Sequence, residues 1–226
     1  TAHRAHSSTA TIARFFPDTA ATGLLMEKEI QFLGDALLQP KRPFYAIIGG
    51  AKISTKFGVL QALLKKVDGL LIGGAMAYTF FKAKGWNIGA SLYEEDMVDK
   101  ARDILKKAEE LGVKLVLPQD NVVASQMNAE AEVRIVLSKE GIPDGFSGVD
   151  IGPRTIEEFK ELLHSALTVL WNGPLGVFEI PRFAEGTEAI AEALASYSAT
   201  TIVGGGDSIA AIQKLGFTHQ FAHLST

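Results

Sequence analysis

Two lysines follow a glycine pair in this chain, and a carboxylate follows a second run of glycines far downstream. Lys52 and Lys56 come after Gly49-Gly50, and Asp207 closes Gly204-Gly205-Gly206. Lysine ammonium groups neutralise phosphate oxygens as point charges, and Mg²⁺ usually binds one or two carboxylates together with substrate phosphates. In phosphoryl transfer, the protein mainly positions the reactants and neutralises their charge, so these residue types indicate phosphoryl transfer.

Four glycine-rich turns follow apolar, strand-like segments, at residues 49–50, 73–74, 172–176 and 204–207. In open parallel sheets, ligands bind beyond the carboxyl ends of the strands. Glycine lets the backbone come close to a ligand, and each turn leads towards a helix whose first N–H groups favour an anion. We therefore expect the four turns to meet at one edge of a sheet and to form one site.

Structural explanations compete with this interpretation at each polar residue. Lys52 and Lys56 are four residues apart, so on a helix they would share one face, which could simply be solvated. Asp207 could serve as a helix N-cap instead of a metal ligand. Glu179, just past a glycine turn, could accept the hydroxyl groups of a ribose.

The aromatic and histidine residues favour other roles. Trp171 and Phe178 flank the Asn-Gly-Pro turn, and we interpret both as core residues rather than as surfaces on which a base stacks. His3 and His6 have a spacing that could suit a metal, but no third ligand lies nearby in the sequence. Arg4 between them better suits an anionic group, which its guanidinium can bind through two hydrogen bonds.

Apolar segments alternate with amphipathic helices along most of the chain, which predicts a parallel sheet covered by helices on both faces. The fold class is therefore α/β, a three-layer, doubly wound, Rossmann-like arrangement. The main strands are expected at residues 44–48, 69–72, 113–117, 168–171 and 200–203. Helices are expected at about 24–38, 57–67, 75–84, 94–111, 185–195 and 208–215.

The middle of the chain is less regular. Three short strands are expected at residues 122–124, 133–136 and 148–151. Thr155 and Glu158 form a capping-box pattern ahead of a further helix.

Composition limits the classes of function. The 22 basic and 26 acidic residues give a net charge of −4, which argues against a nucleic-acid partner. With no cysteine, disulfides and thiolate chemistry are absent. No apolar run approaches the roughly 20 residues of a membrane span. A cytoplasmic location is compatible with the absence of cysteine, and we expect a monomer with small-molecule partners. The chain lacks an initial Met and ends directly after a strand-like segment, so we expect a piece of a longer protein.

Familiar nucleotide-binding patterns are missing. Neither the Walker pattern G-x-x-x-x-G-K-[ST] nor G-x-G-x-x-G after a strand occurs. A dehydrogenase domain on a similar sheet would need that second fingerprint, but it stays an alternative, as does a non-catalytic nucleotide-binding or assembly module. Competition between NAD and ADP would separate the first alternative from a kinase.

Taken together, the motifs resemble those of the phosphoglycerate kinase family, in the family's order. The resemblance runs through the whole chain, and its most specific strings are Trp171-Asn172-Gly173-Pro174 and Gly204-Gly205-Gly206-Asp207. It implies two α/β domains joined by a helix and hinge, one binding 3-phosphoglycerate and the other Mg-ADP or Mg-ATP. Domain closure then allows phosphoryl transfer from 1,3-bisphosphoglycerate to ADP, which gives ATP in glycolysis. Residues 1–22 would end the substrate domain, 23–40 would form the interdomain helix and hinge, and 41–226 would bind nucleotide.

The resemblance also implies a role for each matching residue. His3 and Arg4 would face the phosphoglycerate, Lys52 and Lys56 would contact the nucleotide phosphates and the transferring group, and Asp207 would hold Mg²⁺. The residues implied around the nucleotide are Gly50, Ala51, Gly73, Gly74, Gly148, Asn172, Pro174, Val177, Glu179 for the ribose, Gly204, Gly205, Gly206 and Ser208 near the phosphates.

Two departures from the family pattern bear on the site. Thr55 stands where many members have Asp, which removes a carboxylate near the metal, and Ser208 stands where some members have Thr. Most of the substrate domain and the family's last glycine-rich loop would lie beyond the two ends of the chain. The resemblance therefore implies that these 226 residues alone are inactive.

Overall fold

The computed structural model describes residues 11–17, 19, 21, 23, 39–214, 216, 217, 220, 221 and 223–225. The chain divides into two units, Thr1–Gln39 and Pro40–Thr226. In the first unit, the described residues include a short 3-10 helix, η2 (Ile12–Phe15). The helix expected at 24–38 lies outside the described residues, as do His3 and Arg4.

A parallel sheet forms the centre of the second unit. Within the described residues it has six strands in the order β3-β2-β1-β7-β8-β9, and every neighbouring pair is parallel. All residues of β2 are buried, as expected for a strand covered on both faces. The prediction of a parallel α/β sheet is confirmed. The strands are β1 (Phe44–Ile48), β2 (Gly69–Ile72), β3 (Lys114–Val116), β7 (Thr168–Asn172), β8 (Thr200–Gly204) and β9 (His223–Ser225).

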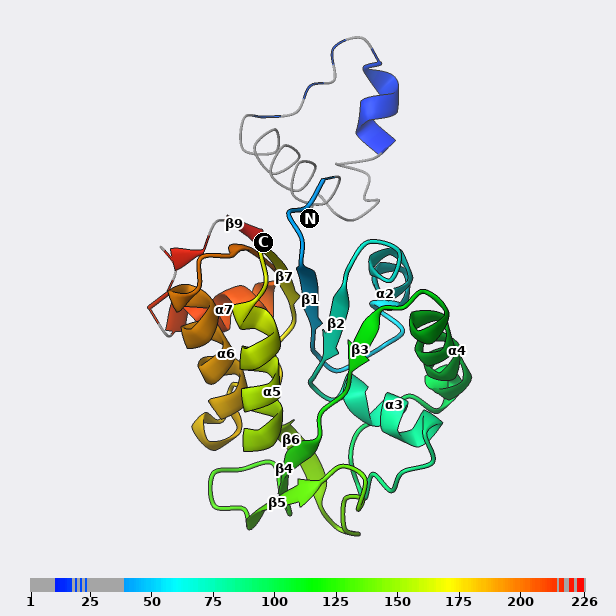
Figure 1. Ribbon diagram of the computed structural model, residues 1–226, viewed down its shortest axis with the longest axis vertical. Coiled ribbons are helices and arrows are strands. Elements are labelled where there is room, and N and C mark those ends of the chain that lie inside the picture. The colour runs from blue at the N-terminus through cyan, green and yellow to red at the C-terminus, as the bar shows by residue number, and fades with distance from the viewer. Residues whose placement is uncertain are drawn as a thin grey trace. The chain divides into compact units, whose positions relative to one another are not determined.

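Helices cover both faces of this sheet. Figure 1 shows α2, α3 and α4 on one side and α5 and α6 on the other. The helix expected at 94–111 begins with a 3-10 turn, η3 (Glu95–Met97), and a second 3-10 turn, η4 (Pro181–Phe183), precedes α6. The α-helices are α2 (Phe57–Leu63), α3 (Met76–Ala83), α4 (Val98–Glu110), α5 (Pro153–His164), α6 (Glu185–Ser196) and α7 (Gly206–Lys214).

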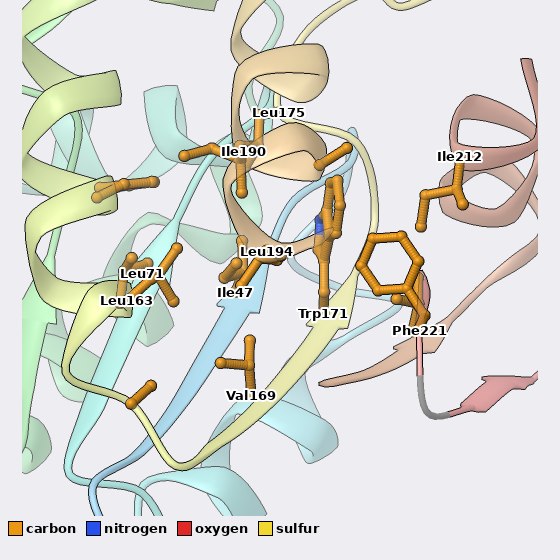
Figure 2. Packing of buried hydrophobic residues seen from close by; sticks show 14 of the residues in the cluster. Ile47, Leu71, Leu163, Val169, Trp171, Leu175, Ile190, Leu194, Ile212 and Phe221 are labelled. Carbon is orange, nitrogen blue, oxygen red and sulfur yellow. The ribbon is translucent and has the colours of Figure 1, made fainter. Parts of the chain in front are cut away.

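Trp171 of β7 lies in the centre of the core under α6 and α7. Its side chain is fully buried, and its indole Nε1 donates to the carbonyl oxygen of Gly173 at 2.8 Å. Figure 2 shows it between Leu194 of α6 and Phe221, with Ile212 of α7 close by. The interpretation of Trp171 as a core residue is confirmed. The indole bond also fixes the turn that follows β7, because Gly173 belongs to that turn.

The three short strands in the middle of the chain form a sheet of their own. β4 (Asp120–Ala124) pairs antiparallel with both β5 (Val133–Leu137) and β6 (Ser147–Ile151). In Figure 1 this small sheet lies beyond the carboxyl ends of the main strands, so it can add a wall to any site at that edge. The sequence predicted the strands but not their separate sheet.

The capping-box interpretation of Thr155 was wrong. Helix α5 begins two residues earlier, at Pro153, with Gly152 as its N-cap. Thr155 is fully buried, and its hydroxyl lies 2.7 Å from the carboxylate of Asp120 on β4. The threonine thus ties α5 to the small sheet instead of capping the helix.

Candidate functional site

Backbone hydrogen bonds join the first three glycine turns directly to one another. The N–H of Gly50 donates to the carbonyl oxygen of Pro174, and that of Gly74 donates to the carbonyl oxygen of Leu175, each at 2.9 Å. The N–H of Met76, where α3 begins, donates to the carbonyl oxygen of Gly50 at 3.0 Å. Turns separated by about 100 residues in the sequence therefore form one connected piece of backbone.

The fourth turn joins the same structure through Ser208 in the first turn of α7. Its buried hydroxyl accepts a hydrogen bond from the N–H of Gly173 at 2.6 Å. On the other side, the N–H of Gly49 donates to the carbonyl oxygen of Asn172 at 2.9 Å. All four turns meet at one edge of the sheet, as the sequence predicted.

Two of these glycines are required by the closeness of the backbones. Gly74 has φ +65° and Gly173 has φ +97°, conformations that side-chain-bearing residues rarely adopt. A Cβ at Gly74 would lie 2.5 Å from the nitrogen of Gly50, and one at Gly173 would lie 2.5 Å from the Lys56 ammonium. The turns can meet only because these positions carry no side chain.

A hollow of about 350 Å³ opens where the first, third and fourth turns meet, and we call it the charged hollow. It holds both predicted lysines and the predicted carboxylate, so the three charges converge as expected. Thr55 also lines it. The lining residues are Gly50, Ala51, Lys52, Thr55, Lys56, Asn172, Gly173, Pro174, Gly205, Gly206, Asp207 and Ser208.

Lys56 is held against the backbone of two turns. Its Nζ donates to the carbonyl oxygens of Gly49 at 2.8 Å and Asn172 at 3.1 Å. Burial lowers the pKa of this ammonium to about 8, although the nearby Asp207 carboxylate acts in the opposite direction. The side chain is therefore fixed in place with a charge that can be lost just above neutral pH.

Lys52 and Lys56 do not lie together on a helix, so their four-residue spacing does not place them on one helix face. Residues 51–56 form a loop, here called the lysine loop, and α2 begins only at Phe57 with Lys56 as its N-cap residue. Lys52 is exposed on this loop, and its carbonyl oxygen accepts a hydrogen bond from the Thr55 hydroxyl at 3.0 Å. Asp207 lies exposed in the first turn of α7.

A second hollow of about 290 Å³ adjoins the first, and we call it the apolar hollow. The two hollows share Gly50, Ala51, Pro174 and Asp207. Predicted residues in the second hollow include Gly74, Gly148, Val177 and the exposed Glu179. Its full lining is Gly50, Ala51, Gly74, Ala75, Tyr78, Leu92, Met127, Gly148, Val149, Pro174, Leu175, Gly176, Val177, Phe178, Glu179 and Asp207.

Sequence reasoning missed the larger side chains of the apolar hollow. Tyr78 comes from α3, Leu92 from the segment before η3, and Met127 from the loop between β4 and β5. Phe178 is only half-buried and lines the hollow, so its interpretation as a core residue was wrong. In the sequence, the position of Tyr78 in its helix is that of an ordinary core residue, and its side chain is in fact 3% exposed.

Asp150 of β6 is buried behind the apolar hollow and fastens α6 to the small sheet. Its carboxylate accepts hydrogen bonds from the backbone N–H groups of Gly186 at 2.7 Å and Ile151 at 2.8 Å. Burial raises the pKa of Asp150 to about 8, against the effect of those two donors. Burial also raises the pKa of the Tyr78 hydroxyl, with a further contribution from Asp150.

Gly73 and Gly204 stand behind the residues that line the hollows. The N–H of Gly73 donates to the carbonyl oxygen of Ile48 at 3.0 Å, and Gly204 is the last residue of β8. Among the described residues, no group of three or more His, Asp or Glu side chains could hold a metal ion by itself. Asp207 therefore suits a cation that arrives with other ligands, such as phosphate oxygens. In the part of the chain that the structure describes, no helix is long and apolar enough to cross a membrane.

Comparison with known proteins identifies the family to which this arrangement belongs. The family model described as phosphoglycerate kinase matches residues 1–226. The chain belongs to the phosphoglycerate kinase family. Members include the phosphoglycerate kinase of Clostridium novyi, 53% identical over 226 residues, and that of Limosilactobacillus reuteri, 55% identical over 228 residues. Each alignment covers all of this chain but only 56% and 55% of the respective relative, so the chain spans about half the length of these relatives.

Solved structures of the family agree with the fold. A phosphoglycerate kinase from Coxiella burnetii has a TM-score of 0.88 at 42% identity, and the match covers 90% of this chain and 52% of that one. The phosphoglycerate kinase from Pyrococcus horikoshii has a TM-score of 0.80 at 35% identity, covering 100% of this chain and 56% of that one. Both support the α/β architecture described above.

Proposed function

We propose that this chain supplies the Mg-ADP/ATP site of a phosphoglycerate kinase. The complete enzyme would transfer a phosphoryl group from 1,3-bisphosphoglycerate to ADP in glycolysis, giving 3-phosphoglycerate and ATP. One observation carries the proposal: an apolar hollow and a charged hollow adjoin and share Gly50, Ala51, Pro174 and Asp207. A nucleotide fits this pair of hollows, because its flat, largely apolar base is linked through the ribose to a charged polyphosphate.

The apolar hollow suits the base and the ribose. Gly74 and Gly148 line this hollow between α3 and the small sheet, and Val177 and Pro174 offer apolar contacts. Glu179 lies exposed at the same hollow, where its carboxylate can accept ribose hydroxyl groups. In this proposal Gly73 supports the slot from behind.

The charged hollow suits the phosphates. Lys52 and Lys56 provide two ammonium groups, and the first turn of α7, which begins at Gly206, presents backbone N–H groups that favour an anion. We assign Lys52 and Lys56 the catalytic role of neutralising charge on the transferring group. Asp207 would bind the Mg²⁺ of the substrate Mg-ADP, with Asn172, Gly204 and Ser208 shaping the pocket around the phosphates.

The remaining parts of the proposal concern residues and segments outside the described structure. His3 and Arg4 would bind phosphoglycerate, residues 1–22 would end that substrate domain, and residues 23–40 would form the interdomain helix and hinge. Hinge closure would bring the acyl phosphate to the nucleotide. We further propose a cytoplasmic monomer, and two plant relatives bear the name cytosolic phosphoglycerate kinase.

Calorimetric titration of the 226-residue chain with Mg-ADP tests the proposal. We expect one binding site, no displacement by NAD, and no phosphoryl transfer by the chain alone. Failure to bind Mg-ADP, or displacement of ADP by NAD, would contradict the proposal. Measurable turnover would contradict the claim that other segments are needed.

Asp207→Ala tests metal binding. The variant should weaken Mg-ADP binding by roughly tenfold, because a carboxylate ligand to Mg²⁺ is lost, and should leave binding of metal-free ADP nearly unchanged. Both titrations are done by calorimetry, with and without a chelator. Equal losses for the two forms of ADP would argue against a metal ligand at this position.

A further inference from the structure

The segment at residues 90–94, between α3 and η3, contacts the walls of both hollows. The N–H of Gly148, which lines the apolar hollow, donates to the buried Ser91 hydroxyl at 2.8 Å. Leu92 lines the same hollow. Two residues later, Glu94 reaches the lysine loop of the charged hollow. One short segment therefore connects the two halves of the proposed nucleotide site.

Glu94 fastens the lysine loop through Ser54. One carboxylate oxygen accepts the N–H of Ser54 at 3.0 Å, and the other accepts the Ser54 hydroxyl. The backbone N–H of Glu94 donates to the buried Thr79 hydroxyl of α3 at 3.1 Å, so the glutamate is itself anchored to a helix. A loop that carries an exposed lysine is thus tied to a fixed support at its centre.

Hydrogen bonds from the lysine loop favour the ionised form of Glu94. Partial burial opposes ionisation, but hydrogen bonds from Ser54 and Ile53 and the positive charge of Lys52 lower the pKa of Glu94 overall. Hydrogen bonds to a charged acceptor are stronger than those between neutral groups. The contact can therefore hold the loop throughout the physiological range.

We propose that Glu94 is a positioning residue that holds the lysine loop so that Lys52 lines the charged hollow. The proposal rests on the nucleotide-binding function inferred above and adds Glu94, which is not among the residues that line either hollow and acts through the lysine loop. The sign of its effect distinguishes positioning from simple electrostatics. A nearby carboxylate repels phosphate, so electrostatics alone predicts tighter ADP binding when Glu94 is removed, whereas loss of positioning predicts weaker binding.

Amide hydrogen exchange tests the contact without any ligand. In the full 226-residue chain, Glu94→Ala should speed exchange of the Ser54 N–H by at least about tenfold, because its acceptor is lost. The N–H of Gly50, which donates to Pro174, serves as an internal control and should not change. Glu95→Ala, at the exposed neighbouring residue of η3, should leave both amides unchanged. Unchanged exchange at Ser54 in Glu94→Ala would overturn the proposal.

Calorimetry then tests the consequence for binding. Glu94→Ala should weaken ADP binding by roughly tenfold and adenosine binding by less than about twofold, since adenosine does not reach the lysine loop. Glu94→Gln should restore most of the ADP affinity, because its amide can still pair with both groups of Ser54. Tighter ADP binding, equal losses for ADP and adenosine, or a Gln variant as weak as the Ala variant would each contradict positioning. If the proposed function itself were wrong, the unaltered chain would not bind ADP, and this result differs from all of those above.

Discussion

The two hollows share a backbone wall, but they hold their functional groups by different means. In the charged hollow, the backbone of the glycine turns fixes Lys56 directly through the carbonyl oxygens of Gly49 and Asn172. In the apolar hollow, the large side chains come from separate elements, such as α3 for Tyr78 and the β4–β5 loop for Met127. The backbone geometry of the turns therefore determines where the charged groups lie, whereas the packing of separate helices and loops determines the apolar surface. The two halves of the proposed site should therefore respond to different perturbations.

Removing a lysine from the charged hollow should have the largest effect of all the changes considered, and it should lower the turnover number. In a full-length phosphoglycerate kinase carrying this chain, Lys52→Ala should reduce kcat by about 10²–10³, the usual scale for losing one preorganised electrostatic contact. Steady-state kinetics with saturating ADP measures it. Lys65→Ala, at an exposed lysine just past α2, is the matched control and should leave kcat unchanged. Near-normal turnover of Lys52→Ala would remove the catalytic role from this residue.

Shortening a side chain that lines the apolar hollow should weaken binding of the base and should not affect the positions of the lysines. Phe178→Ala should weaken binding of adenosine and ADP to the same degree, roughly tenfold, because contact area with the base is lost while the lysines stay in place. Calorimetry on the chain measures both affinities. Ile135→Ala removes an exposed apolar side chain from β5 and should change neither affinity. If ADP binding were weakened while adenosine binding was not, the assignment of the base to this hollow would be wrong.

The lowered pKa of Lys56 gives the charged hollow a pH dependence above neutral pH. Burial lowers this pKa to about 8 in the free chain, and phosphates beside the ammonium should raise it in the complex. ADP binding should then take up a proton above pH 8, and affinity should fall by at most about tenfold per pH unit. Well below pH 8 the lysine is charged in both states, so its contribution is constant.

Titrations between pH 7 and 10 in buffers of different ionisation enthalpy measure this proton uptake. Lys56→Arg keeps a charge that does not titrate in this range and should flatten the ADP profile. Adenosine titrated over the same range reports any separate contribution from Asp150 behind the apolar hollow. A slope that persists in Lys56→Arg would assign the titration to another group.

The contrast between the hollows also explains what could be predicted from the sequence. The main sheet and its turns were predictable because carboxyl ends of parallel strands share one edge, which forces residues such as Gly50 and Gly173 together. Lys56 and Asp207 could be found because charged residues beside such turns stand out. Met127 gave no signal, since a lone methionine in a loop has no pattern, and Tyr78 follows the same helical spacing as buried core residues.

The local patterns that did not predict the structure have equally specific causes. Lys52 and Lys56 have helical spacing, but α2 begins only after them, so spacing without a helix start carried no information on a shared face. Thr155 matched a capping box, yet Gly152-Pro153 immediately upstream was the stronger signal, because proline is favoured at the first helical position. The small antiparallel sheet was missed because the order in which short strands pair depends on contacts distant in sequence.

A change in salt concentration should have the smallest effect on nucleotide affinity. It should also distinguish the two hollows, because only the charged hollow should respond. Exposed charges are screened over a Debye length of roughly 10 Å at 0.1 M salt, and partly buried charges are screened less. Raising NaCl from about 50 to 200 mM should therefore weaken ADP binding by only about twofold to threefold, mainly through the exposed Lys52, and should barely change adenosine binding. Lys52→Ala should remove most of this salt dependence, whereas Lys65→Ala should not. Should the two variants show the same slope, the attraction would come from the overall charge of the chain and not from the lysine loop.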